Sequence, residues 1–264
     1  ERSLLVCRLI TRLPTPRYHE TSTLMHPLQK RIKNTPEIKQ QLLNSIEIDD
    51  YQCTTVSFVN PFSYQLLRKN EKAYQSIDHF YSDGIISCYV LGTLLGKKIP
   101  RVSFDYGSFA KTFFKVAAER KLPVFIVGSK EEQLQGAIKQ FTLSYPSLNI
   151  CGSHNGYFSD DTKIIEQIKK SGAQYVICGL GTPKQDIFAG KIKEHLPEQV
   201  KQIYTCGGFL HQSENRVNYY PDFINKYNLR WLYRAINEPQ VAKRLITKYP
   251  LFAFYALWDR FLAK

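Results

Sequence analysis

From about residue 54, short apolar runs alternate with longer stretches in which apolar residues recur at helical spacing. The runs are Thr54–Val59, Ile77–Tyr81, Val124–Val127, Leu148–Cys151, Tyr175–Cys178 and Gln202–Cys206. Short runs that are apolar nearly throughout are typical of strands buried on both faces of a parallel sheet. The alternation of such runs with helices indicates βαβ units. The pattern therefore predicts a doubly wound α/β fold with a mostly parallel sheet.

The stretches between these runs have the length and spacing of helices. They are Ser63–Arg68, Ile85–Leu95, Ser108–Glu119 with Ser108 as N-cap, Glu131–Leu143, Asp161–Lys170 and Pro183–His195. After Cys206 the pattern changes to a polar loop followed by basic, aromatic helical stretches. We therefore divide the chain into an N-terminal extension (1–50), which has a helical stretch at Pro36–Ser45, an α/β domain (51–215) and a C-terminal helical appendage (216–264).

The charge of the chain is concentrated near its two ends. The formal net charge is +13, of which residues 1–40 carry +5 and residues 226–264 carry +6. The composition, 43% hydrophobic and 22% charged over 264 residues, is that of a globular protein and excludes a disordered chain. The basic ends suit a phosphate-bearing surface, either membrane or nucleic acid. Solvated Lys and Arg on helix faces explain them equally well.

The cysteines and the apolar stretches favour a cytosolic protein but do not by themselves prove the compartment. None of the six cysteines has the C-x-x-C spacing of metal sites and redox pairs, so we expect buried free thiols in a reducing cytosol. The longest apolar stretch, Tyr249–Trp258, is shorter than the roughly 20 residues that span a bilayer. The segment Leu4–Leu13 lacks the features of a secretory signal.

Ligands of open parallel sheets bind beyond the carboxyl ends of the strands, so the loops after the runs are the places to look for function. Asn60-Pro61 follows the first run and Ser82-Asp83-Gly84 follows the second. Gly152–Gly156 follows the fourth run and Gly179–Asp186 the fifth. An Asp before a Gly is also a common turn residue, so Asp83 alone fits a functional and a structural role.

The loop after the fifth run is the richest in candidate donors for phosphate oxygens. Gly179 and Gly181 would allow close approach to the backbone, and Pro183 in the first helical turn would leave N–H groups free. Lys184 adds a positive charge, and Gln185 offers a donor and an acceptor for a sugar hydroxyl or a uracil edge. A glycine-rich turn would explain Gly181 but would leave Lys184 and Gln185 without a role. Neither a dinucleotide fingerprint nor a P-loop is present.

Taken in order, the motifs of this chain resemble the WecG/TagA/CpsF glycosyltransferase family over about residues 54–250. They are Asn60-Pro61, Ser82–Gly84, Arg101, Val124–Gly128, Tyr145-Pro146, Gly152 with Gly156–Phe158, Gly179–Asp186, Trp231–Arg234 and Glu238-Pro239. The chain departs from the family pattern at Phe58, at Leu210-His211 and at Arg230, where the family has Thr, Phe-Asp and Glu.

The resemblance implies a Rossmann-like fold and an inverting, metal-independent transfer. A hexose or N-acetylhexosamine would pass from a UDP donor to a polyprenyl-diphosphate-linked acceptor during synthesis of a surface polysaccharide. No cofactor or metal is expected. The enzyme would be cytoplasmic, peripheral on the inner face of the bacterial cell membrane, with the appendage facing the membrane and helping to complete the active site.

The resemblance also implies roles for single residues. Asp83 falls on the proposed general base, Arg101 on a basic residue near the donor phosphates, and Gln185 on a donor-binding glutamine. Asn60 matches the asparagine after the first strand. His211 would be a substrate contact or a second acid–base group, although a hydrogen-bonded loop histidine is as good an interpretation.

The appendage carries aromatic side chains interleaved with basic ones, an arrangement that favours a membrane surface or the acceptor. Its candidate contacts are Arg230, Trp231, Arg234, Lys243 and Arg244. The alternative is a helix that packs its aromatic face on the core.

A second function class, a basic nucleic-acid-binding protein without catalysis, lacks a recognition motif, so no nucleic acid is expected. A nucleotide-sugar epimerase or dehydrogenase would need the missing dinucleotide fingerprint. The sequence leaves a homo-oligomer open.

Overall fold

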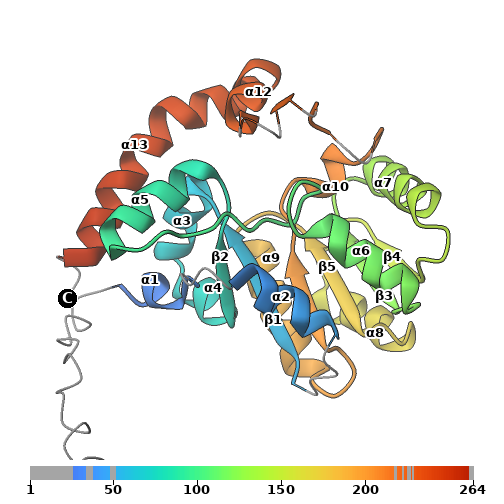
Figure 1. The fold of residues 1–264 in the computed structure, drawn as a ribbon. Coiled ribbons are helices and arrows are strands. Elements are labelled where there is room, and N and C mark those ends of the chain that lie inside the picture. Colours follow the sequence, from blue (N-terminus) through green and yellow to red (C-terminus); the bar gives the residue numbers. More distant parts are fainter. Residues whose placement is uncertain are drawn as a thin grey trace, which may run out of the picture.

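The computed structural model describes residues 26–33, 38–47, 52–216, 219–221, 223–224, 227 and 229–261. Cys7 and most of the N-terminal extension lie outside these residues. Six parallel strands form one sheet in the order β2-β1-β6-β5-β3-β4 (Figure 1). They are β1 (Thr54–Val59), β2 (His79–Ser82), β3 (Val124–Gly128), β4 (Ile150–His154), β5 (Tyr175–Gly179) and β6 (Gln202–Thr205). The predicted parallel α/β fold is confirmed.

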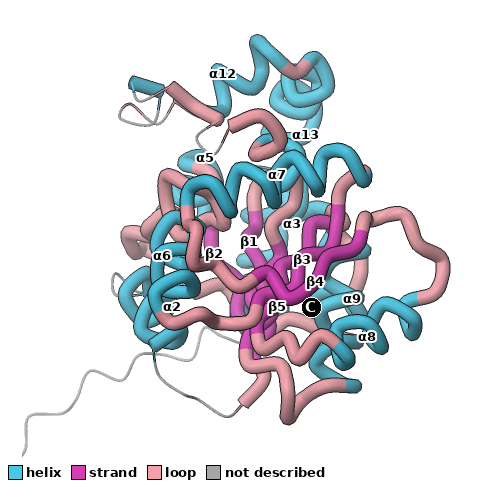
Figure 2. The backbone as a smooth tube through the Cα atoms, turned by 90° about the vertical axis from the view of Figure 1, so that its right-hand side faces the viewer, coloured by secondary structure: helices cyan, strands magenta, loops and turns pink. Residues whose placement is uncertain are grey.

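Helices cover both faces of this sheet. They are α1 (Pro27–Arg31), α2 (Ile38–Glu47), α3 (Pro61–Arg68), α4 (Glu71–Gln75), α5 (Ile85–Leu95), α6 (Ala110–Glu119), α7 (Glu131–Ser144), α8 (Asp161–Lys170), α9 (Lys184–His195), α10 (Phe209–Gln212), α12 (Arg230–Asn237) and α13 (Pro239–Phe261). Figure 2 shows α2 and α6 on one side of the strands and α8 and α9 on the other.

The alternation of side chains along each strand divides the core into two layers. On β3, Val124 and Ile126 pack with α2, α6 and α7, whereas Phe125 and Val127 pack with α3, α4, α8 and α9. All four side chains are buried. This explains why the strands are apolar nearly throughout rather than at every second position.

Several predicted boundaries differ from the observed ones: the helix expected from Ser63 begins at Pro61, and the strand expected from Ile77 begins at His79. The fourth strand begins at Ile150, because the Leu148 N–H donates to the Tyr145 carbonyl and closes a turn there. Gly152–His154 therefore belongs to strand β4 and not to the loop that follows it. Ser108 is not an N-cap: its hydroxyl accepts from the Ser103 N–H, and the helix begins two residues later.

The C-terminal helix α13 packs on the core instead of standing outside it. It contacts α3 and α5, and its Phe252 and Ala256 side chains are fully buried. Asp259 is fully buried too, beside Tyr64 and Arg68 of α3. The alternative interpretation, an aromatic helix on the core, is thus correct for this face of α13.

The described part of the N-terminal extension packs beside the sheet. Ile32 forms a parallel bridge with Phe80 of β2, and Leu42 and Ile46 of α2 are buried against the sheet. Gln29 of α1 donates to the Ala256 carbonyl of α13. Among the described residues, no helix is both long enough and apolar enough to cross a membrane.

Candidate active site

The register of β1 and β2 brings two candidate residues to one edge of the sheet. Val59 pairs with Ser82, and each is the last residue of its strand, so Asn60 and Asp83 follow at adjacent positions. The Asp83 N–H donates to the Val59 carbonyl at 2.8 Å. Asn60 is the N-cap of α3, since its Oδ1 accepts from the Phe62 and Ser63 N–H groups. Its oxygen therefore serves the helix.

Asp83 forms an ion pair with Arg101. Arg101 Nη2 lies 3.0 Å from Asp83 Oδ1, and the Val102 N–H donates to the Ser82 carbonyl, which fixes this connection beside β2. The Asp83 side chain keeps 27% of its surface exposed, so a substrate can reach it. Burial lowers the pKa of Arg101, but the charges of Asp83 and Asp105 outweigh it and raise that pKa above its ordinary value.

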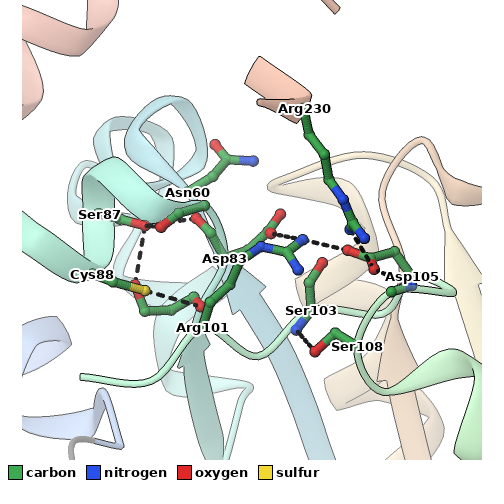
Figure 3. A network of polar contacts seen from close by, with 12 residues as sticks. Asn60, Asp83, Ser87, Cys88, Arg101, Ser103, Asp105, Ser108 and Arg230 are labelled. Carbon is green, nitrogen blue, oxygen red and sulfur yellow. Dashed lines mark hydrogen bonds and ion pairs between the residues drawn. The ribbon is translucent and has the colours of Figure 1, made fainter. Parts of the chain in front are cut away.

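The network continues through Asp105 to helix α12 (Figure 3). Asp105 Oδ2 accepts from Arg101 Nη2, and Asp105 Oδ1 lies 2.6 Å from Arg230 Nη1. Burial opposes ionisation of Asp105, yet the two arginine charges lower its pKa. Four alternating charges thus link the end of β2 to the first residue of α12.

Gln185 is buried under the glycine loops instead of facing solvent. Its Oε1 accepts from the N–H groups of Gly181 and Gly207, at 3.2 and 3.1 Å. Both glycines have positive φ, and a Cβ on either would meet nothing within 4 Å. We call these two glycines, with Gln185 beneath them, the glycine cradle. Its open side gives a ligand close access to the backbone.

The start of α9 differs from the prediction. Pro183 is the N-cap rather than a residue of the first turn, and the Gln185 N–H donates to the Gly181 carbonyl. This N–H is therefore not free for a phosphate. Lys184 is exposed, its Nζ donates to the Gly156 carbonyl, and it lies 4.3 Å from the ring centre of Phe158.

Asp186 lies buried between β1 and β6. Its Oδ1 accepts from the Ser57 hydroxyl at 2.6 Å, and Ser57 in turn accepts from the Thr205 hydroxyl at 2.8 Å. Burial raises the pKa of Asp186 to about 6. The sequence placed this residue at the end of a motif but gave it no role. The structure shows that it joins α9 to two strands beneath the site.

His211 lies apart from the Asp83 network, on α10. Its Nδ1 is 2.8 Å from Gln133 Nε2 of α7 and 3.7 Å from Glu214 Oε2, and 60% of its side chain is exposed. The described contacts are those of a hydrogen-bonded surface histidine.

Helix α12 directs Arg234 towards the same region as Asp83. Arg234 forms a two-bond pair with Glu238, both bonds at 3.0 Å. Burial lowers the pKa of Arg234, but the Glu238 hydrogen bond and the Glu238 and Asp83 charges raise it. The Asp83 charge also contributes, after burial, to the raised pKa of Tyr249 on α13. Arg234 of α12 and Tyr249 of α13 thus lie close enough to Asp83 to be influenced by its charge.

The remaining appendage candidates are spread over α12 and α13. Arg230 lies against Asp105, Trp231 is about one third exposed, and Arg244 lies 4.2 Å from the ring centre of Phe62. Lys243 is exposed. Of these, Arg230 is bound within the protein and away from the exposed face.

The structure unites Asn60, Asp83 and Arg101, and it brings Gly181, Pro183, Lys184 and Gln185 together in a second group that includes Gly179. Sequence reasoning missed Asp105 and Gly107, which lie in the connection after Arg101. The only available signal was an acidic residue four positions after an arginine. No cluster of His, Cys, Asp or Glu able to hold a metal ion occurs in the described part of the chain.

Comparison with known proteins places the chain in a family. Residues 25–264 match the model of the glycosyl transferase WecG/TagA/CpsF family. The chain is 38% identical over 224 residues to the UDP-Gal:α-D-GlcNAc-diphosphoundecaprenol β-1,4-galactosyltransferase of Shigella boydii, covering 84% of this chain and 91% of that one. It is 26% identical over 231 residues to the N-acetylglucosaminyldiphosphoundecaprenol N-acetyl-β-D-mannosaminyltransferase of Bacillus subtilis, covering 83% and 89%. The protein therefore belongs to the WecG/TagA/CpsF family of glycosyltransferases.

Proposed function

We propose that this glycosyltransferase moves a hexose or N-acetylhexosamine, with inversion, from a UDP donor to a polyprenyl-diphosphate-linked sugar. The observation that carries this proposal is the partly exposed Asp83–Arg101 pair at the carboxyl end of the sheet, where Asp83 directly follows the last residue of β2. The two relatives named above act on acceptors with a diphosphoundecaprenol group, which supports the acceptor class. Because the chain belongs to a family of glycosyltransferases, the alternative function, nucleic-acid binding without catalysis, is not supported.

Asp83 is the proposed general base. The acceptor hydroxyl oxygen forms a bond to the anomeric carbon while the bond from that carbon to the donor diphosphate breaks. The acceptor proton passes to the Asp83 carboxylate, and the electron pair of the broken bond leaves with UDP. Such proton transfer contributes about 10²–10⁴-fold to the rate. One base and one displacement invert the anomeric centre.

The glycine cradle and Lys184 are the proposed contacts of the donor diphosphate. Gly181 and Gly207 leave open space beside the backbone, and Gly179 ends the strand that leads into this loop. The Lys184 ammonium provides positive charge at the same edge, while Arg101 acts from beside the base. Gln185 acts indirectly in this scheme because it holds the cradle from below. Asn60 contributes its side-chain nitrogen beside Asp83, and His211 is kept as a candidate substrate contact only.

The exposed face of α13 is the proposed attachment to the inner face of the cell membrane. Leu251, Phe254, Trp258 and Phe261 recur at helical spacing and are each at least two fifths exposed. Lys243 and Lys248 lie on the same helix and are exposed. Apolar and aromatic groups beside basic ones favour the headgroup region of an anionic leaflet. This arrangement brings the site and a lipid-linked acceptor to one surface.

The test is a transfer assay with purified protein, a synthetic GlcNAc-diphosphate-lipid acceptor and a panel of radiolabelled donors. UDP-galactose and UDP-N-acetylmannosamine represent the two kinds of relative. We expect one UDP-sugar to be used, with the product linkage inverted and activity retained in EDTA. Transfer with retention, or loss of activity in EDTA that Mg²⁺ or Mn²⁺ restores, would contradict the mechanism. No transfer from any UDP-sugar would contradict the function.

A further inference from the structure

Asp105 binds two arginines that come from distant parts of the chain. Its Oδ2 accepts from Arg101, and its Oδ1 forms an ion pair with Arg230, the first residue of α12. The Gly107 N–H donates to Oδ1 at 2.8 Å, and the Ala110 N–H donates to the Asp105 carbonyl, so the carboxylate is fixed by its own turn. Only 14% of this side chain is exposed. Pairs this well shielded are much less weakened by salt than surface pairs.

Gly107 gives independent evidence that Arg230 is seated in a built site. A Cβ at position 107 would lie 1.5 Å from Arg230 Nη2 and 2.7 Å from its Cζ. The guanidinium therefore lies directly on the backbone, where only glycine leaves room. The Arg230 guanidinium also lies over the Tyr220 ring, with its Cζ 4.9 Å from the ring centre. We call Asp105, Gly107 and Tyr220 the Arg230 socket.

We propose that Asp105 is a positioning residue for the transfer reaction. Asp105 shares the Arg101 guanidinium with Asp83, and it holds helix α12 in place over Asp83. This inference rests on the proposed function. Arg101 Nη2 donates to both acids, and among the described residues no donor contacts Asp83 Oδ2. That oxygen is the one free to accept the acceptor proton.

Without the Asp105 charge, Arg101 would be free to close on Asp83 with two parallel hydrogen bonds. Guanidinium and carboxylate groups favour this geometry. Such a pair would occupy both Asp83 oxygens, stabilise the carboxylate and make it a weaker base. Asp105 therefore keeps Arg101 close to Asp83 without letting it cover the reacting oxygen.

The socket also fixes the helix that carries Arg234. Arg230 and Arg234 are one turn apart on α12, so seating Arg230 sets the position of Arg234. The charged and titratable groups near Asp83 are then Arg101, Asp105, Arg234, Tyr220, Tyr249 and, on α5, Cys88. Of these, Asp105 is paired with both Arg101 and Arg230, the first residue of α12.

The experiment compares Asp105→Asn, Gly107→Ala and the control Asp161→Asn in the full chain. Asp161 is also paired with a basic residue, Lys191, but it lies on α8. For each variant we measure kcat, KM for the UDP-sugar and the pH dependence of kcat, with folding checked by circular dichroism. We expect Asp105→Asn to lower kcat about tenfold or more, with KM within about twofold, because small misplacements of reacting groups are costly.

The pH profile separates positioning of the base from general support of the fold. In Asp105→Asn the acid limb of the kcat profile should move to lower pH, since Arg101 closes on Asp83. In Gly107→Ala kcat should fall without that movement, because Asp105 still binds Arg101. A folded Asp105→Asn variant with the wild-type kcat and profile would overturn the inference, as would a drop in kcat with no movement of the acid limb.

A variant that fails to fold does not end the test. If Asp105→Asn is unfolded, the kcat values of Arg230→Gln and Gly107→Ala become the test. A wild-type kcat in both variants would overturn the inference. If the wild-type chain transfers no sugar from any UDP donor, the proposed function fails first. When Asp105→Asn folds, a lower kcat together with the movement of the acid limb, with Asp161→Asn unchanged, supports the inference.

Discussion

Asp259, close to the end of α13, accepts hydrogen bonds from Arg68 of α3, with Arg68 Nη2 at 2.6 Å and Arg68 Nε at 2.8 Å from its two oxygens. The Tyr64 hydroxyl donates to the same carboxylate at 2.8 Å. Asp259 has no exposed surface. The helix that presents an apolar face to solvent is therefore anchored to the sheet domain through a buried ion pair on its other side.

The first prediction concerns this anchor. Asp259→Ala leaves Arg68 and the Tyr64 hydroxyl without their partner, and breaking a buried pair in this way costs about 3–5 kcal/mol. We expect the free energy of unfolding, measured by urea titration, to fall by about that amount. Asp161→Ala, which breaks the half-exposed pair with Lys191, should cost about 1 kcal/mol or less. Equal losses in the two variants would contradict the anchoring role.

The second prediction follows from the raised pKa of Asp186. Because the folded-state pKa is about 6 and the ordinary value 3.8, the folded protein holds this proton more tightly than the unfolded chain. Its contribution to stability is therefore complete below about pH 4 and is lost as the pH rises through about 6. Asp186→Asn removes the ionisation and keeps the shape.

The measurement is the difference in unfolding free energy between Asp186→Asn and wild type, at pH 4 and at pH 7.5. We expect the variant to gain relative to wild type at the higher pH, by about 3 kcal/mol for a shift of two units. A difference that does not change with pH would show that Asp186 is ionised normally.

The strand pattern made the sheet predictable, whereas no sequence pattern predicted which charged residues pair. Burial on both faces makes each strand a continuous apolar run, and Asn60 and Asp83 follow directly from where such runs end. Asp105 and Arg230 are 125 positions apart, and no local pattern shows that they meet. Gly107 is recognisable only once the guanidinium packed on it is seen.

The sequence pattern also could not show which side chains of α13 are buried and which are exposed. Phe252 and Ala256 are buried and Phe254 and Trp258 are exposed, yet all four belong to one apolar stretch. A helix that is apolar all round gives no period from which its packed face can be read. Likewise, Gln185 lies in a loop motif typical of ligand contacts, and only the structure places it beneath the glycines.

The third prediction concerns Gln185. Replacing it with Ala removes the shared acceptor of the Gly181 and Gly207 N–H groups, so the glycine cradle loses its shape. An unsatisfied hydrogen bond of this kind costs about 1–3 kcal/mol, so we expect the Kd for UDP, measured by calorimetry, to rise about tenfold or more. Gln135→Ala on α7 is the matched control. Unchanged UDP affinity in Gln185→Ala would show that the glycine cradle does not contribute to donor binding.

The fourth prediction concerns the exposed face of α13. Phe254→Ser with Trp258→Ser should weaken cosedimentation with anionic vesicles about tenfold or more, because each buried aromatic contributes roughly 1.5–3 kcal/mol. Leu143→Ser on α7 removes a side chain of even greater exposure, 67%, and should have no effect. Lys243→Glu with Lys248→Glu should weaken binding mainly at low salt. Vesicle binding that survives both double substitutions would place the attachment elsewhere.

Asp83→Asn is the most direct test of whether Asp83 is the base of a UDP-sugar transferase. The substitution keeps the shape and polarity of the side chain and removes its ability to take a proton. We measure transfer to the lipid-linked acceptor in single turnovers, and UDP affinity by calorimetry on the same preparation. We expect the transfer rate to fall about 10²-fold or more, with nearly unchanged UDP affinity. A variant that transfers sugar at a rate close to that of the wild type would contradict this role of Asp83.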